Sequence, residues 1–190
     1  MTAPAAIVIG ASVGAIDALM RILPALPKGY RPAILVVVHV PPDRKSLLAS
    51  LFGERCALPV KEADDKESIQ AGTIYFAPPN YHLLVEPDFT LSLSIDEPVH
   101  YSRPSVDVLF ESAADAYGDS LVGIILTGAN QDGADGMRAI WEAGGQALVQ
   151  NPATAEGTAM PLAALAACPG AQAFPLEEIT SLLKSYSSPN

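Results

Sequence analysis

The sequence predicts an α/β protein with a doubly wound, mostly parallel sheet and an inserted antiparallel β-meander. Three unbroken apolar runs, at 5–9, 33–38 and 121–126, are typical of strands that are covered by helices on both faces. The first run is followed by a glycine-containing turn and by apolar residues at helical spacing over 16–23. This β-α-β order implies a right-handed crossover and a parallel strand pair.

The remaining elements follow the same alternation, apart from one segment. We expect a helix over 43–52 that Asp43 starts and Gly53 ends, and a helix over 106–117 with Ser105 at its N-cap. Further helices are expected at about 133–143, 158–167 and 177–184, and further strands at 59–62, 147–149 and 171–174. The exception is a series of three short strands at 73–77, 83–86 and 90–95, which form the predicted meander.

Length and composition restrict the class of protein. With 190 residues and 49% hydrophobic content, we expect a single globular domain over 1–190. The net charge of −10 argues against binding nucleic acid through a basic face. The N-terminus lacks a signal-peptide pattern and no apolar run reaches the ~18 residues of a membrane span. We therefore expect no membrane insertion and a cytoplasmic location.

The two cysteines, Cys56 and Cys168, lie far apart and show no C-x-x-C spacing. A structural metal site is therefore not supported, and free thiols are the favoured state, with one disulfide as the alternative.

The turn from Gly10 to Gly14 has the pattern Gly-x-Ser-x-Gly, between the first strand and the first helix. Such a turn presents Ser12 at a strand end beside a helix N-terminus, as a nucleophile elbow requires. Glycine-rich turns in this place also bind phosphate groups in nucleotide-binding folds. From the turn alone the two interpretations are equally supported, although Ser12 and Ala15 stand where the second and third fingerprint glycines belong.

Polar residues at two other strand ends favour the nucleophile. His39 follows the second apolar strand, and Asp132 lies in the cluster Asn130-Gln131-Asp132 after the strand at 121–126. A serine needs a base to take its proton, and a carboxylate orients the imidazole and stabilises its charged form. Because parallel strands end at one edge of a sheet, these three side chains are expected there together.

Each of these residues also has an ordinary structural interpretation. His39 could be a surface histidine, and Asp132 could cap the following helix together with Asp135. His82 is expected to be structural, and the sequence assigns no role to His100. Met137 and Trp141 share one helical face and are expected in the core.

Several segments together resemble the catalytic domain of the CheB-type chemotaxis protein-glutamate methylesterases, in order and spacing. The resemblance covers nearly the whole chain. It rests on 9–14, 38–42, 103–110, 125–133 and 174–179, and on 72–78 with His82 and 159–161.

The resemblance implies a Ser-His-Asp triad of Ser12, His39 and Asp132, with no metal and no cofactor. It implies hydrolysis of glutamyl methyl esters on methyl-accepting chemotaxis receptors, with possible deamidation of receptor glutamines. The backbone N–H groups of Val13, Ala129 and Asn130 are the implied oxyanion donors, each worth roughly 2.7–4 kcal/mol of barrier.

The chain departs from the family pattern at two places. Val13-Gly14-Ala15 stands where the family usually has Thr-Gly-Gly, and Ala129-Asn130 stands where it usually has Met-Gly. Two alternatives therefore stay open: a related esterase or amidase with another substrate, and a catalytically weak signalling module that binds a related signalling protein. A typical member also carries a receiver domain, and whether one has been removed here or never existed is open.

Overall fold

The computed structural model describes residues 3–39 and 47–187. The strands are β1 Ala6–Ala11, β2 Ala33–Val38, β3 Val60–Glu62, β4 Ile74–Phe76, β5 His82–Val85, β6 Leu91–Ser94, β7 Leu121–Ile125, β8 Gln146–Gln150 and β9 Gln172–Phe174. The α-helices are α1 Ala15–Ile22, α2 Leu48–Gly53, α3 Val106–Tyr117, α4 Ala134–Glu142, α5 Ala159–Ala167 and α6 Leu176–Ser185. Short 3₁₀ turns cover Leu23–Ala25, Gly118–Ser120 and Pro152–Thr154.

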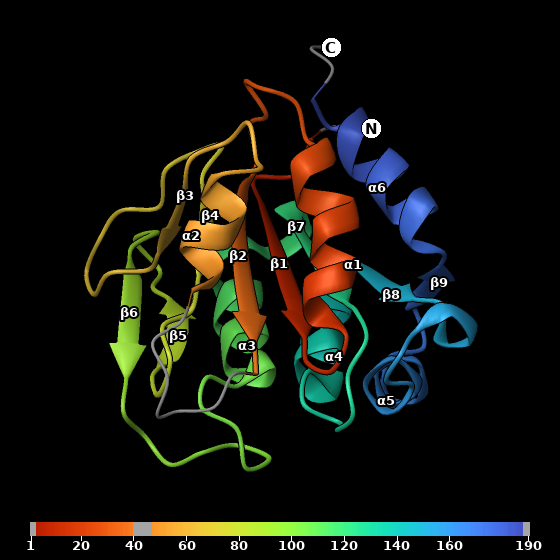
Figure 1. Cartoon of the computed structure of the whole chain (residues 1–190). Coiled ribbons are helices and arrows are strands. Elements are labelled where there is room, and N and C mark those ends of the chain that lie inside the picture. The colour runs from red at the N-terminus through yellow and green to blue at the C-terminus, as the bar shows by residue number, and fades with distance from the viewer. Residues whose placement is uncertain (1–2, 40–46, 188–190) are drawn as a thin grey trace.

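A parallel sheet with the order β3-β4-β2-β1-β7-β8-β9 forms the centre of the molecule. Figure 1 shows α1, α2 and α6 in front of this sheet, with α3 and α4 behind it. The order reverses at β1, because β2, β3 and β4 lie on one side of it and β7, β8 and β9 on the other. The predicted doubly wound α/β fold is therefore confirmed.

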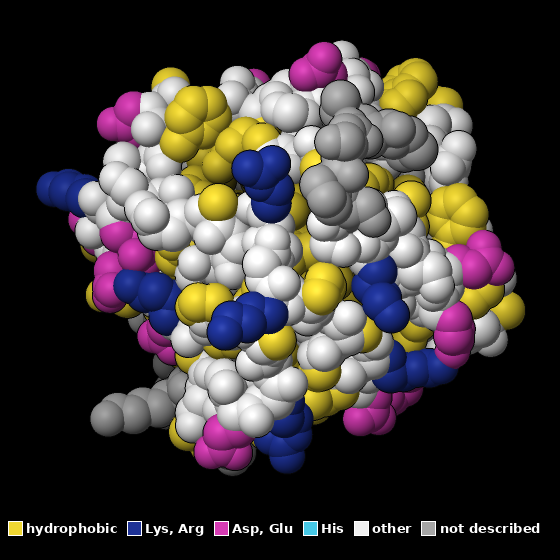
Figure 2. Space-filling view, turned by 90° about the horizontal axis from the view of Figure 1, so that it is seen from above, with side chains coloured by type: hydrophobic (Ala, Val, Ile, Leu, Met, Phe, Trp, Pro, Cys, Tyr) yellow, Lys and Arg dark blue, Asp and Glu magenta, His cyan; other side chains and the backbone are white. Residues whose placement is uncertain are grey.

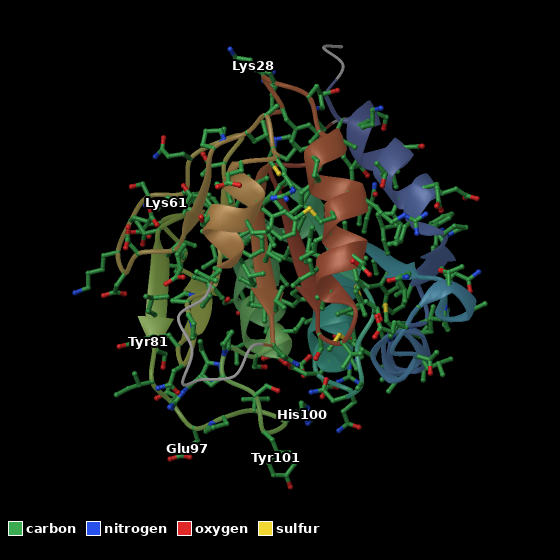
Figure 3. The ribbon with its side chains drawn as sticks, in the orientation of Figure 1. Lys28, Lys61, Tyr81, Glu97, His100 and Tyr101 are labelled. Atoms are coloured by element: carbon green, nitrogen blue, oxygen red, sulfur yellow. The ribbon has the colours of Figure 1, made fainter. Side chains whose placement is uncertain are left out.

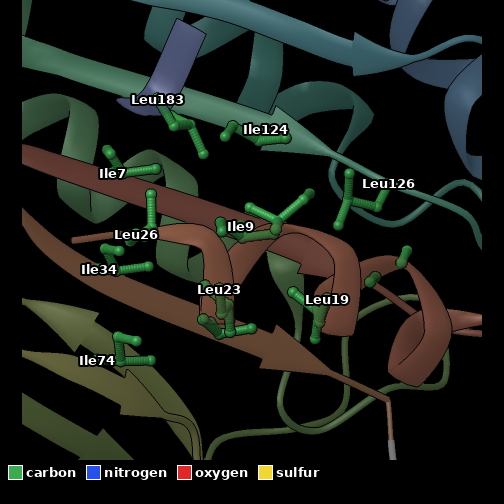
Figure 4. Close-up of a cluster of buried hydrophobic side chains, with 14 of the residues drawn as sticks. Ile7, Ile9, Leu19, Leu23, Leu26, Ile34, Ile74, Ile124, Leu126 and Leu183 are labelled. Carbon is green, nitrogen blue, oxygen red and sulfur yellow. The ribbon is translucent and has the colours of Figure 1, made fainter. Parts of the chain in front are cut away.

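The two faces of the sheet explain the unbroken apolar runs. In β1, Ile7 and Ile9 pack into the cluster under α1 and α6, whereas Ala6 and Val8 pack into the cluster under α3 and α4. Figure 4 shows the first cluster, in which β1 side chains meet Leu183 of α6. Each fully buried aliphatic side chain contributes about 1.5–3 kcal/mol, so a polar residue in either set would be costly.

The predicted meander is in fact a two-stranded hairpin of β5 and β6. The first of the three expected strands, at 73–77, is β4, which pairs in parallel with β2 and β3 and belongs to the main sheet. All three residues of β4 are buried, as expected for a strand that has helices on one side and the hairpin on the other. Of the three expected meander strands, β6 is the most exposed, with three of its four residues partly buried, as an antiparallel surface strand allows.

Two apolar residues do not lie where helical spacing predicts. The buried side of α1 is formed by Ala15, Ala18, Leu19 and Ile22, and Ile16 is 48% exposed. In α4, Met137 is buried as expected, but the Trp141 side chain lies at the surface.

Some expectations concern other parts of the chain. The proposed cap at Asp43 lies outside the described residues, and α2 begins at Leu48. Cys56 and Cys168 are both free thiols. Among the described residues, none of the helices has the length and apolar character needed to cross a bilayer.

The strands direct their carboxyl ends to the lower edge of the molecule in Figure 1. The opposite end is seen in Figure 2, where acidic, basic and apolar side chains are interspersed over the surface. Among the described residues visible in that view, no one side-chain type is concentrated in a patch that would mark a binding surface. The polar residues singled out by the sequence all lie toward the carboxyl edge, where α3 and α4 begin.

Helices α3 and α4 approach each other closely at Gly136. A Cβ atom at this position would lie 2.5 Å from the Cβ of Phe110 and 3.2 Å from the Cα of Asp107. These are backbone-fixed atoms, so one helix would have to move to admit a methyl group. The glycine therefore allows the two helix N-termini to come together.

We predict that Gly136→Ala lowers the free energy of unfolding by a net of about 1–2 kcal/mol, because overpacking exceeds the helix propensity that alanine gains. Urea denaturation measures the change. Gly53→Ala is the matched control, since a Cβ there meets nothing within 4 Å and should be neutral or stabilising. Equal behaviour of the two variants would contradict the close approach.

Candidate active site

Ser12, His39 and Asp132 lie at the ends of three neighbouring strands. Ser12 follows β1, His39 follows β2, and Asp132 lies between β7 and α4. Because β2 and β7 are the two neighbours of β1, their carboxyl ends meet around Ser12. The structure thus brings to one edge the three residues that the sequence predicted would be there.

The Ser12 turn is held by Thr127, which lies two residues beyond the end of β7, the strand next to β1. The Thr127 hydroxyl donates to the carbonyl oxygen of Val13 at 2.7 Å and accepts from the Gly157 N–H at 2.8 Å. The Thr127 carbonyl accepts from the Ser12 N–H at 2.9 Å. Gly14 has φ 78°, the left-handed conformation that glycine adopts without steric cost.

Gln150 completes this support, because its side-chain oxygen accepts from the buried Thr127 N–H at 3.0 Å. The sequence analysis missed both Thr127 and Gln150. The available signal was their position: each is a polar residue at the end of an otherwise apolar strand. Such residues must find partners when they are buried.

Asp132 is fully buried and receives four hydrogen bonds. The N–H groups of Val106 and Asp107 donate to it at 2.7 and 3.0 Å, and the Ser105 hydroxyl donates at 2.7 Å. The fourth bond joins it to His39 Nε2 at 2.7 Å. Burial raises the pKa of Asp132, but the bond to His39 and the other donors outweigh burial and lower it below the ordinary value. The carboxylate is therefore charged at neutral pH.

Asp132 does cap a helix, but not the one expected. It accepts from the first N–H groups of α3, whereas the sequence had offered α4 as the alternative. Asp107 of α3 makes the reciprocal contact and accepts from the Gly136 N–H of α4 at 2.7 Å. Ser105 holds the predicted N-cap position, yet its hydroxyl binds Asp132 and makes no capping bond to its own helix.

His82 supports the same region. Its Nδ1 accepts from the backbone N–H of Ser105 at 3.1 Å, and its Nε2 contacts the Glu97 carbonyl at 3.1 Å. The first bond makes Nδ1 the acceptor, so Nε2 carries the proton. This buried histidine fixes the residue whose hydroxyl holds Asp132, in keeping with its expected structural role.

A second carboxylate, Asp107, lies beside Asp132. Burial and, to a smaller degree, the nearby Asp132 raise the pKa of Asp107 to about 6 although the Gly136 N–H acts to lower it. His100 Nε2 lies 3.4 Å from the Oδ2 atom of Asp107. Asp107, His100 and Asp135 place one ligand atom each within 4.8 Å of one another, the spacing of a possible cation site. Their polar atoms already have protein partners, since Asp135 pairs with Arg138 and Asp107 with α4.

We predict that Asp107 makes stability depend on pH. Its folded pKa is raised above the unfolded value near 3.9, so its stabilising contribution is complete below about pH 4 and is lost as pH rises through 6. Relative to Asp107→Asn, the parent should lose free energy of unfolding between pH 4 and 7 in urea denaturation. Asp115→Asn, exposed on the same helix, controls for the lost charge. A constant difference between parent and Asp107→Asn would contradict the assignment.

His39 has one ring nitrogen available for chemistry. Its Nε2 is committed to the charged Asp132, so Nε2 carries the proton and donates it. Nδ1 is then the basic nitrogen, and it faces the Asn130 side chain, whose Nδ2 lies 3.5 Å away. The orientation that the Asp gives the ring thus selects Nδ1 as the proton acceptor.

Ser12 and His39 line one pocket of about 280 Å³. Its other lining residues are Gly14, Ala15, Ile16, Asp17, Val38 and Leu48. Within the described residues, the Ser12 hydroxyl makes no hydrogen bond, and the N–H groups of Val13, Ala129 and Asn130 donate to no protein acceptor. These groups are thus free to contact a ligand, and the exposed Ile16 is explained by its place in the pocket wall.

A tight hairpin forms part of the same edge of the molecule. Val99 and Ser102 exchange two backbone hydrogen bonds across His100 and Tyr101, which both have positive φ. Arg103 holds the loop by donating to the Ile95 carbonyl at 2.7 Å, among other contacts. Figure 3 shows Tyr101 pointing into solvent at this lower edge, with His100 above it.

We predict that Asp132→Asn destabilises the fold by roughly 2–4 kcal/mol, in addition to any effect on chemistry. An amide has one acceptor oxygen, so its NH₂ group would face donors that the carboxylate now satisfies. Thermal or urea unfolding measures the loss. The control is Asp135→Asn, an exposed neighbour whose ion pair is worth little. A stable Asp132→Asn protein would show that these bonds do not support the fold.

The comparisons with known proteins agree with the geometry. The model of the CheB methylesterase family matches residues 7–183. The chain therefore belongs to the CheB methylesterase family. The crystal structure of the Thermotoga maritima CheB methylesterase catalytic domain superposes with a TM-score of 0.89 at 29% identity, covering 97% of this chain and 99% of that one.

The chain spans nearly the full length of some similar proteins and about half the length of others. A putative protein-glutamate methylesterase/protein-glutamine glutaminase of Leptospira interrogans is 48% identical over 177 residues, covering 93% of this chain and 92% of the relative. The corresponding protein of Bordetella parapertussis is 36% identical over 92% of this chain, which spans 51% of its length. That of Symbiobacterium thermophilum is 39% identical over 82% of the chain and 43% of its own length. This CheB-type chain thus corresponds to nearly all of some relatives and about half of others.

Proposed function

We propose that this family member is a serine hydrolase that removes methyl groups from glutamyl methyl esters of proteins, with Ser12, His39 and Asp132 as its triad. The observation that carries the proposal is the 2.7 Å bond between His39 Nε2 and Asp132, on a histidine that shares a pocket with Ser12. The arrangement supplies a nucleophile, a base and a buried anion in the roles that acyl transfer requires.

In this mechanism the Ser12 oxygen attacks the ester carbonyl while its proton passes to His39 Nδ1. Asp132 stabilises the imidazolium through Nε2. The tetrahedral intermediate then collapses, and the methoxy group leaves as methanol with the proton from Nδ1. Water, deprotonated by the same nitrogen, attacks the acyl-enzyme, releases the glutamate carboxylate and restores Ser12.

The developing oxyanion needs donors that are not already engaged. The N–H groups of Val13, Ala129 and Asn130 are proposed for this task, supported by their lack of acceptors among the described residues. The Val13 carbonyl is held by Thr127, which fixes the turn before substrate arrives. Donors held in place in this way do not have to reorganise during the reaction, and this is the source of their catalytic effect.

The proposed substrates are methylated glutamates of chemotaxis receptors in the cytoplasm, with receptor glutamines as possible substrates for deamidation. The names of the relatives, protein-glutamate methylesterase/protein-glutamine glutaminase, support this assignment. A glutamine would be hydrolysed by the same steps, with ammonia as the leaving group in place of methanol. No metal or cofactor takes part in the proposed steps.

One observation favours an alternative, a signalling module with weak catalysis. The Ser12 hydroxyl is not hydrogen-bonded to His39 in the described structure, so the nucleophile is not activated in this state. A fluorophosphonate probe distinguishes the two functions, because only an activated serine is labelled at a useful rate. Labelling that depends on Ser12 supports the hydrolase, and an unlabelled protein supports the module.

We predict that Ser12→Ala lowers methanol release from a methylated receptor fragment by a factor of at least about 10³, because it removes the nucleophile. Stability should be unchanged, since the Ser12 hydroxyl bonds to none of the described residues. Ser181→Ala, on the surface of α6, is the control and should retain full turnover. Undiminished turnover in Ser12→Ala would refute the assignment of the nucleophile.

A further inference from the structure

The side chain of Asn130 lies between His39, the proposed base, and Ser102 of the tight turn at Val99–Ser102. Its Nδ2 lies 3.5 Å from His39 Nδ1 and 3.5 Å from the Ser102 hydroxyl. Its Oδ1 accepts from the Asp132 N–H at 3.2 Å. This last bond fixes the orientation of the amide, because only an oxygen can accept from a backbone N–H. The NH₂ group must then face His39.

We propose that Asn130 is a positioning residue whose amide donates to His39 Nδ1 in the resting enzyme and gives way to Ser12 when substrate binds. The inference rests on the proposed function, since it concerns the nitrogen that would take the Ser12 proton. It concerns the side chain of Asn130, whereas the oxyanion assignment concerns its backbone N–H.

The contact at Nδ1 favours one protonation state of the ring. An amide N–H donates to the lone pair of a neutral imidazole, but it faces a second donor once Nδ1 is protonated. On the other side of the ring, Asp132 requires the proton to be on Nε2. The two neighbours therefore select the same neutral tautomer, the one with a basic Nδ1.

The charged groups around His39, Asp132 among them, act on the overall charge of the ring and favour its protonated form. Among the described residues, Asp132 contacts the ring from the segment before α4, and Asp17 of α1 lines the same pocket. Asp107 lies beside Asp132, and Glu156 packs against Gly14 in the Ser12 turn. All four are carboxylates, which favour a charged imidazolium. The Asn130 amide is the neutral donor that opposes them.

The contact between the Asn130 amide and His39 Nδ1 can also be replaced by a contact with Ser12. A hydrogen bond of 3.5 Å is long and weak, so an incoming partner can displace it. The Ser102 hydroxyl gives the amide a second acceptor at the same distance, and Asn130 stays paired when Nδ1 receives a proton. This explains why the Ser12 hydroxyl bonds to none of the described residues although it shares a pocket with His39.

Two substitutions test the proposal through the titration of His39, followed by ¹⁵N NMR of labelled histidine and by the pH profile of methanol release. Asn130→Ala should move the midpoint of both to higher pH by roughly half to one unit, the effect of losing one hydrogen bond. Asn130→Asp should move it up by roughly 1–3 units, because a carboxylate facing Nδ1 favours the imidazolium. Activity of Asn130→Asp should then fall at neutral pH and recover in alkaline buffer.

Asn130→Asp keeps the Oδ1 acceptor for the Asp132 N–H, but it also adds a charge beside the ring. Asn130→Ala is therefore the variant that tests the hydrogen bond, because it removes the amide donor without adding a charge. Ser102→Ala is the matched control, since it alters the other partner of the amide and should not move the midpoint. A midpoint of Asn130→Ala within about 0.2 units of the parent would overturn the proposal. The NMR titration needs no turnover, so its outcome is distinct from a failure of the methylesterase assignment, which the Ser12→Ala assay decides.

Discussion

The Asp132 carboxylate receives its four hydrogen bonds from two segments far away in the sequence, and the geometry of the site depends on them. Three donors belong to the first turn of α3, and the fourth is His39 at the end of β2. A helix N-terminus offers unpaired N–H groups and a partial positive charge, so it holds an anion in place that would otherwise be costly to bury. The Asp132 carboxylate thereby fixes the position of the α3 N-terminus relative to the His39 imidazole, the proposed catalytic base.

The pairing of α3 with α4 extends this constraint. Asp107 of α3 caps α4 while Asp132, just before α4, caps α3, so neither carboxylate can move without releasing the other helix. Two buried carboxylates side by side repel each other, and the fold accommodates this in opposite ways. Four donors keep Asp132 ionised, while burial and its neighbour raise the pKa of Asp107. The charge needed for the proposed chemistry stays on the residue that contacts His39.

Much of this arrangement could be predicted from local patterns, and some could not. The three strand-end residues were predictable because parallel strands finish at one edge, so Ser12, His39 and Asp132 had to be neighbours. Thr127 and Gln150 were missed because their importance lies in what they contact across the sheet. Helical spacing wrongly predicted that Ile16 and Trp141 would be buried. A helix next to a site or at the margin of the core can expose an apolar side chain.

The sequence by itself determined the α/β alternation, the parallel sheet and the three polar strand ends, because these follow from apolar periodicity and from turn-forming glycines. Only the tertiary structure decided which helix Asp132 caps, which nitrogen of His39 stays free and where the Asn130 amide points. Those features depend on contacts between residues more than 25 positions apart in the chain or on side-chain orientation. Local sequence preferences carry no information about such contacts.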